Sequence, residues 1–149
     1  MTKFHFRLAS VLRLREVQLA VEEEKLQLLL AELARMERSL TAMSEERRAA
    51  LAFVQKQTAV GHAELRALSA FLLGTGARAA QLRETIQQTK GLAAEQRQRV
   101  TLAQRNERLL LKLKDAKLSE WQAQYDRELE AVAQETWRAV QNVHHRQSN

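Results

Sequence analysis

Five leucines at strict seven-residue intervals constrain this chain more than any other feature of its sequence. They are Leu12, Leu19, Leu26, Leu33 and Leu40. A second ladder lies four residues before or three after members of the first, at Leu8, Leu29, Met36 and Met43. This alternation is typical of an α-helix whose apolar seam faces another helix in a left-handed supercoil. Such a chain has little concave interior, so we expect partner binding rather than catalysis.

The composition favours long helices over a compact globule. The 149 residues include no proline, only four glycines and 5% aromatic residues. The absence of cysteine excludes disulfides and thiolate metal sites. No apolar run approaches the ~18 residues that span a bilayer. The first 14 residues lack the apolar core of a signal peptide, so we expect a cytoplasmic protein.

The charge of the chain is basic and unevenly distributed. The net charge is +6 and the pI is about 10.2. Residues 97–117, here called the basic segment, carry an excess of five positive charges. A solvated helix face is the plainer interpretation. The alternative is a docking stripe for an acidic protein surface or for nucleic acid.

These patterns predict an all-α fold, a long antiparallel two-helix coiled-coil hairpin in a single domain spanning residues 1–149. We expect the first helix at about 4–57, the turn at about 58–63, the second helix at about 64–143 and a frayed tail at 144–149. Gly61 can take the left-handed conformation that ends a helix, which places the turn there. The rival turn is Gly74-Thr75-Gly76, near the middle of the sequence.

The two seams differ in quality. The first is interrupted at Arg15 and Glu22, where charge weakens packing and can fix the register. The second is ragged, with Thr89, Gln96 and Glu107 where apolar residues are expected. Its predicted apolar members are Leu65, Leu68, Leu72, Leu82, Ile86, Ala93, Val100, Ala103, Leu110, Leu113, Leu118, Trp121, Tyr125, Leu129, Val132, Trp137, Val140 and Val143. Trp121 and Tyr125, one turn apart, are expected in the seam, with an exposed partner anchor as the alternative.

The sequence carries no catalytic signature. It has no Gly-rich phosphate loop, zinc-binding helix or nucleophile motif. His144 and His145 point to different sides of a helix, and His5 and His62 are distant in sequence. We therefore expect no enzyme activity, no metal, no cofactor and no small-molecule substrate.

Motifs along nearly the whole chain carry a resemblance to a known family. The opening Phe6-x-Leu8-x-x-Val11-Leu12-x-x-Arg15-Glu16 leads into the heptad helix, a Gly-containing break and the Phe71-Leu72 segment. A second motif runs from Asn106-Glu107-Arg108-Leu109 through Leu113-Lys114 to Tyr125 and Glu135. With these features the chain resembles the FliJ family of flagellar export proteins.

The resemblance implies a hairpin similar to the γ-type central stalk of rotary ATPases. Such a stalk inserts into the hexameric flagellar export ATPase, promotes ring assembly and ATP hydrolysis, contacts the cytoplasmic region of a membrane export-gate protein and handles export chaperones. By position, the resemblance assigns to the ATPase ring Phe6, Leu8, Arg15, Glu16 and Glu135. It assigns to the export gate Met43, Phe71 and Leu72. It also implies peripheral association with the inner-membrane face of the export apparatus.

Two other interpretations remain open. A basic coiled-coil adaptor or nucleic-acid-associated protein would use the net charge and the basic segment. Against nucleic acid stands the absence of a basic arm, a helix-turn-helix or aromatics interleaved with that segment. A homodimeric scaffold would instead pair the Leu12 to Leu40 seam between two chains.

Overall fold

The chain folds as an all-α helical hairpin, as the sequence predicts. The structure is a computed structural model that describes residues 3–147, with side chains through residue 143. It contains helix α1 at Ala9–Gln55 and helix α2 at His62–Gln147, and no strand among the described residues. Its contacts form two compact units. The hairpin unit is Gln18–Ala103, and the terminal unit is Met1–Val17 with Gln104–Asn149. The single domain expected from the sequence stays a prediction.

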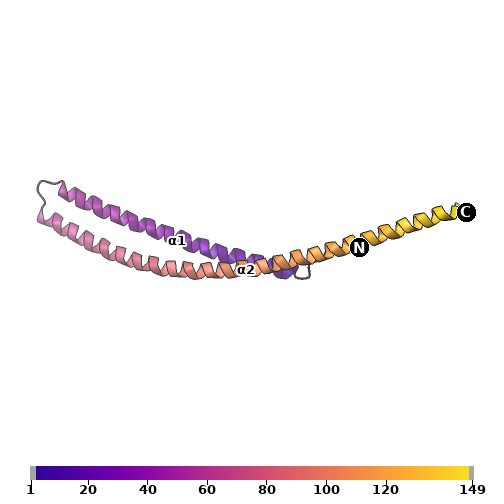
Figure 1. Cartoon of the computed structure of the whole chain (residues 1–149). Helices are drawn as coiled ribbons and strands as arrows, with labels where there is room; N and C mark the ends of the chain where they lie inside the picture. The colour runs from indigo at the N-terminus through magenta and orange to yellow at the C-terminus, as the bar shows by residue number, and fades with distance from the viewer. Residues whose placement is uncertain (1–2, 148–149) are drawn as a thin grey trace. The chain divides into compact units, whose positions relative to one another are not determined.

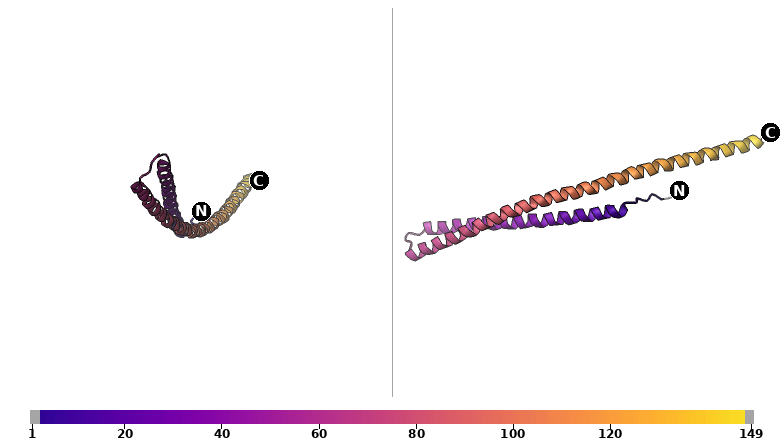
Figure 2. Two further views of the ribbon diagram at one scale, coloured as in Figure 1. Left: turned by 90° about the vertical axis from the view of Figure 1, so that its left-hand side faces the viewer. Right: turned by 90° about the horizontal axis from the view of Figure 1, so that it is seen from below.

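In the hairpin unit the two helices lie side by side and antiparallel (Figure 1, Figure 2). Gln96 of α2 donates a hydrogen bond of 3.0 Å to the backbone carbonyl of Glu22 in α1. Lys90 Nζ lies 3.7 Å from Glu37 Oε1. The α2 partner has a lower number where the α1 residue has a higher one, which defines the antiparallel direction.

The core of the hairpin unit is a narrow apolar seam. Leu33, Met36, Ile86 and Ala93 are buried and form its centre. Five half-buried hydrophobic residues pack against them, namely Leu26, Leu29, Leu30, Leu40 and Leu82. Of the predicted seam leucines, Leu33 is buried in this unit, Leu19, Leu26 and Leu40 are half-buried in it, and Leu12 is buried in the terminal unit. Two helices cannot enclose a side chain on all sides, so burial is deep but incomplete.

The α2 seam is more regular than the sequence predicts. From Leu68 to Ala103, buried and half-buried positions follow the four-three alternation because polar residues take seam positions. Thr75, Thr89 and Gln96 are buried. The hydroxyl of Thr75 donates to the carbonyl of Phe71 at 2.6 Å, and that of Thr89 donates to the carbonyl of Thr85 at 2.9 Å. These bonds within the helix satisfy the hydroxyls, so they can lie in an apolar seam.

The chain reverses near Gly61, as predicted, but the structural role of Gly61 differs from the predicted one. No described glycine has a positive φ, so Gly61 does not end α1 in a left-handed conformation. Its carbonyl accepts a 3.1 Å bond from the Leu65 amide, and its own amide donates to Glu64 Oε2 at 3.2 Å. Gly61 is therefore the N-cap of α2, with Glu64 in the capping-box position. Because α1 ends at Gln55, Leu65 has no helix opposite it and is 48% exposed, not in the seam.

The rival turn at Gly74-Thr75-Gly76 is wrong, because these residues lie inside α2. A Cβ atom added at Gly76 would lie 3.9 Å from Arg47 Nη1, whereas one at Gly74 would meet nothing within 4 Å. Thr75 and Ala79, both buried, show that small side chains occupy this part of the α2 seam. Continuous packing on α1 therefore overrides the low helix propensity of the glycines.

In the terminal unit, α1 begins at Ala9 instead of Phe4, and α2 continues to Gln147, beyond the predicted end at residue 143. Residues 148–149 of the predicted tail lie outside the described residues. Every residue from 126 to 143 is exposed. The prediction of seam positions is wrong for five of them, Leu129, Val132, Trp137, Val140 and Val143. No other described segment packs on this part of α2. The N-terminal residues contact α2 at positions up to Trp121, which precedes it.

The α2 seam also slips within the terminal unit. Half-buried positions fall at Leu110, Lys114 and Leu118, four residues apart, while the predicted seam residue Leu113 is 39% exposed. The four-three alternation ends here because residues 3–8, which precede α1, lie against this part of α2 at Leu113, Lys117 and Trp121. Over the part of the chain that the structure describes, neither helix has the length of apolar sequence that crossing a membrane requires.

Candidate interaction surfaces

Residues 3–8, here called the N-terminal segment, form the first candidate surface. Residues 3–6 have no regular secondary structure, and the Ala9 amide donates to the Phe6 carbonyl at 3.1 Å to start α1. Residues two apart in an extended chain point to the same side. Phe4 and Phe6 are therefore both available to α2, and Phe6 is 8% exposed.

Three aromatic rings join the N-terminal segment to α2. The centroids of Phe4 and Trp121 are 6.1 Å apart, with the rings tilted at 57°. Trp121 stacks on Tyr125 at 5.3 Å. Trp121 and Tyr125 are half-buried, which agrees with the predicted packing role rather than an exposed anchor. Contacts of this kind add about 0.5–1.5 kcal/mol each to the burial of the rings.

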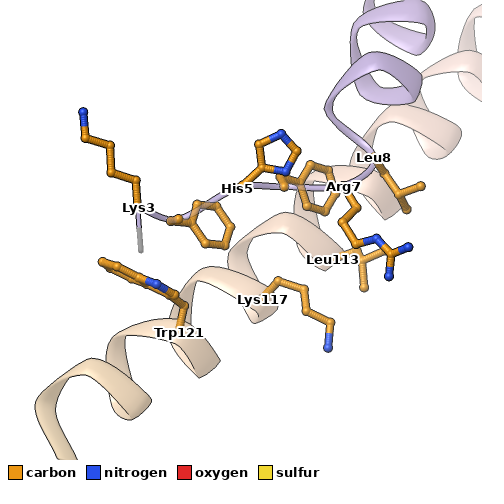
Figure 3. Close-up of a pocket in the computed structure, with 9 residues that line it drawn as sticks. Lys3, His5, Arg7, Leu8, Leu113, Lys117 and Trp121 are labelled. Atoms are coloured by element: carbon orange, nitrogen blue, oxygen red, sulfur yellow. The ribbon is translucent and has the colours of Figure 1, made fainter. Parts of the chain in front are cut away.

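A groove of about 780 Å³ lies between the N-terminal segment and one face of α2 (Figure 3). We call it the aromatic groove; its lining is Lys3, Phe4, His5, Phe6, Arg7, Leu8, Leu113, Lys117 and Trp121. The floor is apolar, and no acidic residue belongs to the lining. In Figure 3, Arg7 and Lys117 extend on the same side as Leu113, while Lys3 points away from α2.

The cations around the groove differ in their partners. Lys117 Nζ is 2.8 Å from Glu120 Oε2, an exposed pair one turn apart. Lys3 and Arg7 form no ion pair with another described residue, and both are exposed. Exposed ion pairs contribute about 0–1 kcal/mol, so a new carboxylate could displace Glu120 from Lys117 at little cost. The basic side chains at the rim of the groove can therefore pair with negatively charged groups of a ligand.

A polar layer in the hairpin unit is the second notable arrangement. Gln96 is buried, and its amide donates to both the carbonyl and the carboxylate of Glu22. The hydrogen bond from Gln96 is the main cause that holds the pKa of Glu22 below its usual value, and Lys25, 3.4 Å away, acts in the same direction. Two residues that interrupt the seams in the sequence thus satisfy each other across the helices.

The structure places the residues of the predicted ATPase-ring set in different environments. Phe6 and Leu8 line the aromatic groove. Arg15 is half-buried on α1, and Glu16 beside it is exposed. Glu135 is exposed on α2, 14 residues beyond Trp121, which corresponds to about 21 Å along the helix axis. Phe6 and Leu8 are brought together, whereas Glu135 is not part of that cluster.

The predicted export-gate residues all lie toward the turn of the hairpin unit. Met43 is about 18 Å before the end of α1, and Phe71 is about 14 Å after the start of α2, at 1.5 Å per residue. Met43 and Leu72 are half-buried seam residues. Phe71 is 39% exposed, so it is the member of this set that offers the most surface to a partner.

A third surface is the exposed apolar stripe of α2 at Leu129, Val132, Trp137, Val140 and Val143, here called the C-terminal stripe. Steps of three and five residues keep these side chains on one side of a helix. Glu135 and Arg138 fall on the other side. Trp137 is 63% exposed, and a side chain of this size is a frequent anchor in protein interfaces.

The basic segment is largely exposed. Six of its seven cations are exposed, and Lys114 is half-buried. Among the described residues, no group of three or more His, Asp or Glu side chains is placed to hold a metal ion. The predicted absence of metal at His144 and His145 lies outside the described side chains.

The sequence missed the aromatic groove because its two walls are far apart along the chain. Phe4-x-Phe6 ahead of the first seam leucine was the available signal, since alternation with period two indicates an extended segment. Arg7, Leu113 and Lys117 gave no signal of their own. Their meeting depends on where the N-terminal segment contacts α2, which no local pattern specifies.

The fold and its surfaces define the chain as an all-α helical hairpin with exposed apolar and basic surfaces. Comparison with protein-family models, with curated proteins and with solved structures finds no match to this chain.

Proposed function

We propose that this chain is a non-catalytic coiled-coil stalk of the flagellar type III export apparatus. In this proposal it inserts into the hexameric export ATPase, promotes ring assembly and ATP hydrolysis, and links the ring to the export gate and to export chaperones. Its place would be the cytoplasm, at the inner-membrane face of the apparatus. The proposal follows the resemblance of the sequence to the FliJ family.

The observation that carries the proposal is the C-terminal stripe. A helix in water usually buries its apolar face, yet Leu129, Val132 and Trp137 remain at least 45% exposed. An apolar stripe on a helix that no other described segment covers is typical of a surface that a partner covers. The central pore of a ring is one such partner, because it surrounds a single helix from several sides.

The hairpin unit supports the same proposal through its stiffness. Paired helices with a continuous seam resist bending, and a matched polar layer fixes their register. A stalk that transmits contact between a ring and a membrane gate needs both properties. In this proposal the exposed ring of Phe71, near the turn of this unit, is the site for the gate protein.

The proposal is tested by ATP hydrolysis of the flagellar export ATPase with and without the chain, together with counting of hexameric rings by negative-stain electron microscopy. We expect faster hydrolysis and more rings. Trp137→Ser should remove most of the stimulation, and Gln134→Ser, an exposed polar control on another side of the same helix, should not. No stimulation by the unmodified chain at micromolar excess would refute the stalk.

The gate contact has its own matched pair of variants. Phe71→Ala should weaken capture of the export-gate cytoplasmic region, whereas Leu73→Ala, which removes an even more exposed apolar side chain, should leave it intact. Equal losses in both variants would indicate nonspecific apolar contact. Hot-spot aromatic residues typically account for at least about a tenfold change in affinity.

The alternative function is a basic coiled-coil adaptor or nucleic-acid-associated protein. The exposure of Arg97, Arg99, Arg105, Arg108, Lys112 and Lys117 in the basic segment favours it. Binding to duplex DNA that weakens steeply with salt would support this function. Absence of such binding, with ATPase stimulation present, would leave the stalk as the better description.

A further inference from the structure

The aromatic groove combines an apolar floor with a basic rim, and nothing in the stalk proposal requires that combination. Its volume of about 780 Å³ falls within the range of about 300–1,000 Å³ typical of pockets that bury a ligand. We propose that the groove binds an acidic amphipathic helix of a partner protein. The apolar side chains of that helix would enter the groove, and its carboxylates would meet Arg7 and Lys117.

The shape of the groove argues for a helix. All nine lining residues come from two elements, the N-terminal segment and one face of α2 (Figure 3). A groove with two walls accepts an amphipathic helix through side chains spaced three, four and seven residues apart. A lipid acyl chain bound there would keep much of its apolar surface in water, because no third wall covers it.

The aromatic contacts argue against nucleic acid as the occupant. Single-stranded binders offer free aromatic faces on which bases stack. Trp121 already packs against Phe4 at 6.1 Å and stacks on Tyr125 at 5.3 Å. Its ring is therefore part of the wall of the groove rather than a free stacking platform.

The charges argue for an acidic partner. No acidic residue lines the groove, and Arg7 forms no ion pair with another described residue. Lys117 has Glu120 as an exposed partner that an incoming carboxylate could replace. Such a rim accelerates the encounter with an acidic segment and disfavours a basic one.

The probe is a synthetic peptide of roughly 18 residues, or about five helical turns, with leucines on one face and glutamates on the others. Binding is followed by Trp121 fluorescence in the full chain carrying Trp137→Phe, since Trp137 is exposed and the only other tryptophan. We expect saturable binding with a Kd of roughly 10–100 μM. A peptide with lysine in place of glutamate, and one with its leucines scrambled, should bind about tenfold more weakly or not at all.

Two pairs of variants locate the site. Arg7→Glu should weaken binding about tenfold, whereas Arg13→Glu, an exposed charge reversal outside the groove, should change it less than about twofold. Leu113→Ser should weaken binding, whereas Leu111→Ser, at a similar exposure of 36% but outside the lining, should not. Circular dichroism establishes that all four variants remain helical.

Other outcomes would overturn the proposal. They are no binding of the acidic peptide up to ~1 mM, equal affinity for the lysine peptide, or equal effects of Arg7→Glu and Arg13→Glu. Binding confined to an oligothymidylate or to phosphatidylglycerol vesicles would assign the groove to nucleic acid or lipid instead. The test contains no ATPase, so its result and that of the stalk proposal are independent.

Discussion

The side-chain amide of Gln96 donates hydrogen bonds to both the backbone carbonyl and the carboxylate of Glu22, a residue 74 positions earlier in the chain. Each residue occupies a polar position in a seam that is mainly apolar around it. The hydroxyls of Thr75 and Thr89 are satisfied within α2, but the longer side chain of Gln96 reaches across the seam and is satisfied by Glu22 at the same level of α1. We infer that this pair fixes the register of α1 against α2, because a shift of one heptad in either direction separates the two residues, and in one direction it places Glu22 at the level of Ala103 and Gln96 at that of Leu29.

Removing the amide should destabilise the hairpin. We expect Gln96→Ala to lower the Tm by about 2–4 °C, because the variant loses two hydrogen bonds and leaves a gap in the seam. Gln98→Ala, at an exposed position of the same helix, should change the Tm by less than about 1 °C. Thermal unfolding followed by circular dichroism at 222 nm measures both. Equal effects would contradict the structural role of Gln96.

Replacing both polar residues by leucine should act in the opposite direction. Glu22→Leu with Gln96→Leu creates an apolar layer, and such replacements commonly raise stability. We expect a higher Tm together with more self-association, because an apolar layer fits several registers and partners. Light scattering after size-exclusion chromatography measures the second effect. A double variant that is less stable and no more self-associated than the unmodified chain would refute the register argument.

The same pair predicts a dependence of stability on pH. Since the folded pKa of Glu22 lies below its unfolded value, the ionised form favours the folded state, and this contribution is fully present above the unfolded pKa. It is lost as the pH falls through the folded pKa. Glu32 behaves likewise because its hydrogen bond and ion pair with Arg35 lower its pKa.

We therefore expect the urea midpoint of the unmodified chain to fall as the pH is lowered from about 5 to 3. Gln96→Ala should show a shallower fall, because the main cause of the lowered pKa of Glu22 is gone, while the contribution of Glu32 remains. Gln98→Ala serves as the control and should match the unmodified chain. Parallel pH profiles for all three proteins would exclude Glu22 as a contributor.

Small seam residues set how closely the helices approach. Ala93 is 3% exposed and belongs to the core, so Ala93→Leu should destabilise the chain by about 1–3 kcal/mol through overpacking. Ala94→Leu adds the same atoms at an exposed position and should change stability by less than about 0.5 kcal/mol. Urea unfolding distinguishes the two. A destabilised Ala94→Leu with a stable Ala93→Leu would contradict the register described here.

Replacing a glycine by alanine should raise or lower the stability of the chain according to the position of the glycine. Gly91 lies inside α2 with open space around it, so Gly91→Ala should stabilise the chain by about 0.5–1 kcal/mol. Gly61→Ala should instead destabilise it, by about 0.5 kcal/mol, because alanine is a poorer N-cap than glycine. The reverse change Ala94→Gly is the control for Gly91. Thermal unfolding measures these changes, and a stability change of the same sign in Gly91→Ala and Gly61→Ala would contradict the capping role of Gly61.

The fold was predictable where one pattern repeated along the chain. The leucines of α1 and the positions of Ile86, Ala93 and Val100 in α2 follow a single period, which survives local irregularities. Gly61 was found as the reversal, but its mechanism was not, because glycine serves at both ends of helices. Gly74 and Gly76 suggested a turn because their low helix propensity is visible in the local sequence. The packing of α2 on α1 that overrides this propensity involves residues distant in sequence.

Residues of the terminal unit were less predictable for a physical reason. Trp137 and Val140 have the spacing of a seam, but a spacing does not show whether a second helix is present to cover them. Lys114, not Leu113, falls in the half-buried row, a shift of one residue that hydrophobicity alone does not reveal. The aromatic groove needed contacts between residues more than 100 positions apart.

The exposed part of α2 from residue 126 onward has a consequence for its dynamics. Its helical hydrogen bonds are supported only by the continuity of the helix with the packed region before it, because an isolated helix of this length is marginally stable in water. Amide protons there should exchange with deuterium in minutes or less, with protection rising toward Trp121. A partner bound to this helix would slow that exchange in the turns it covers. Part of the binding free energy would then offset the cost of ordering the helix.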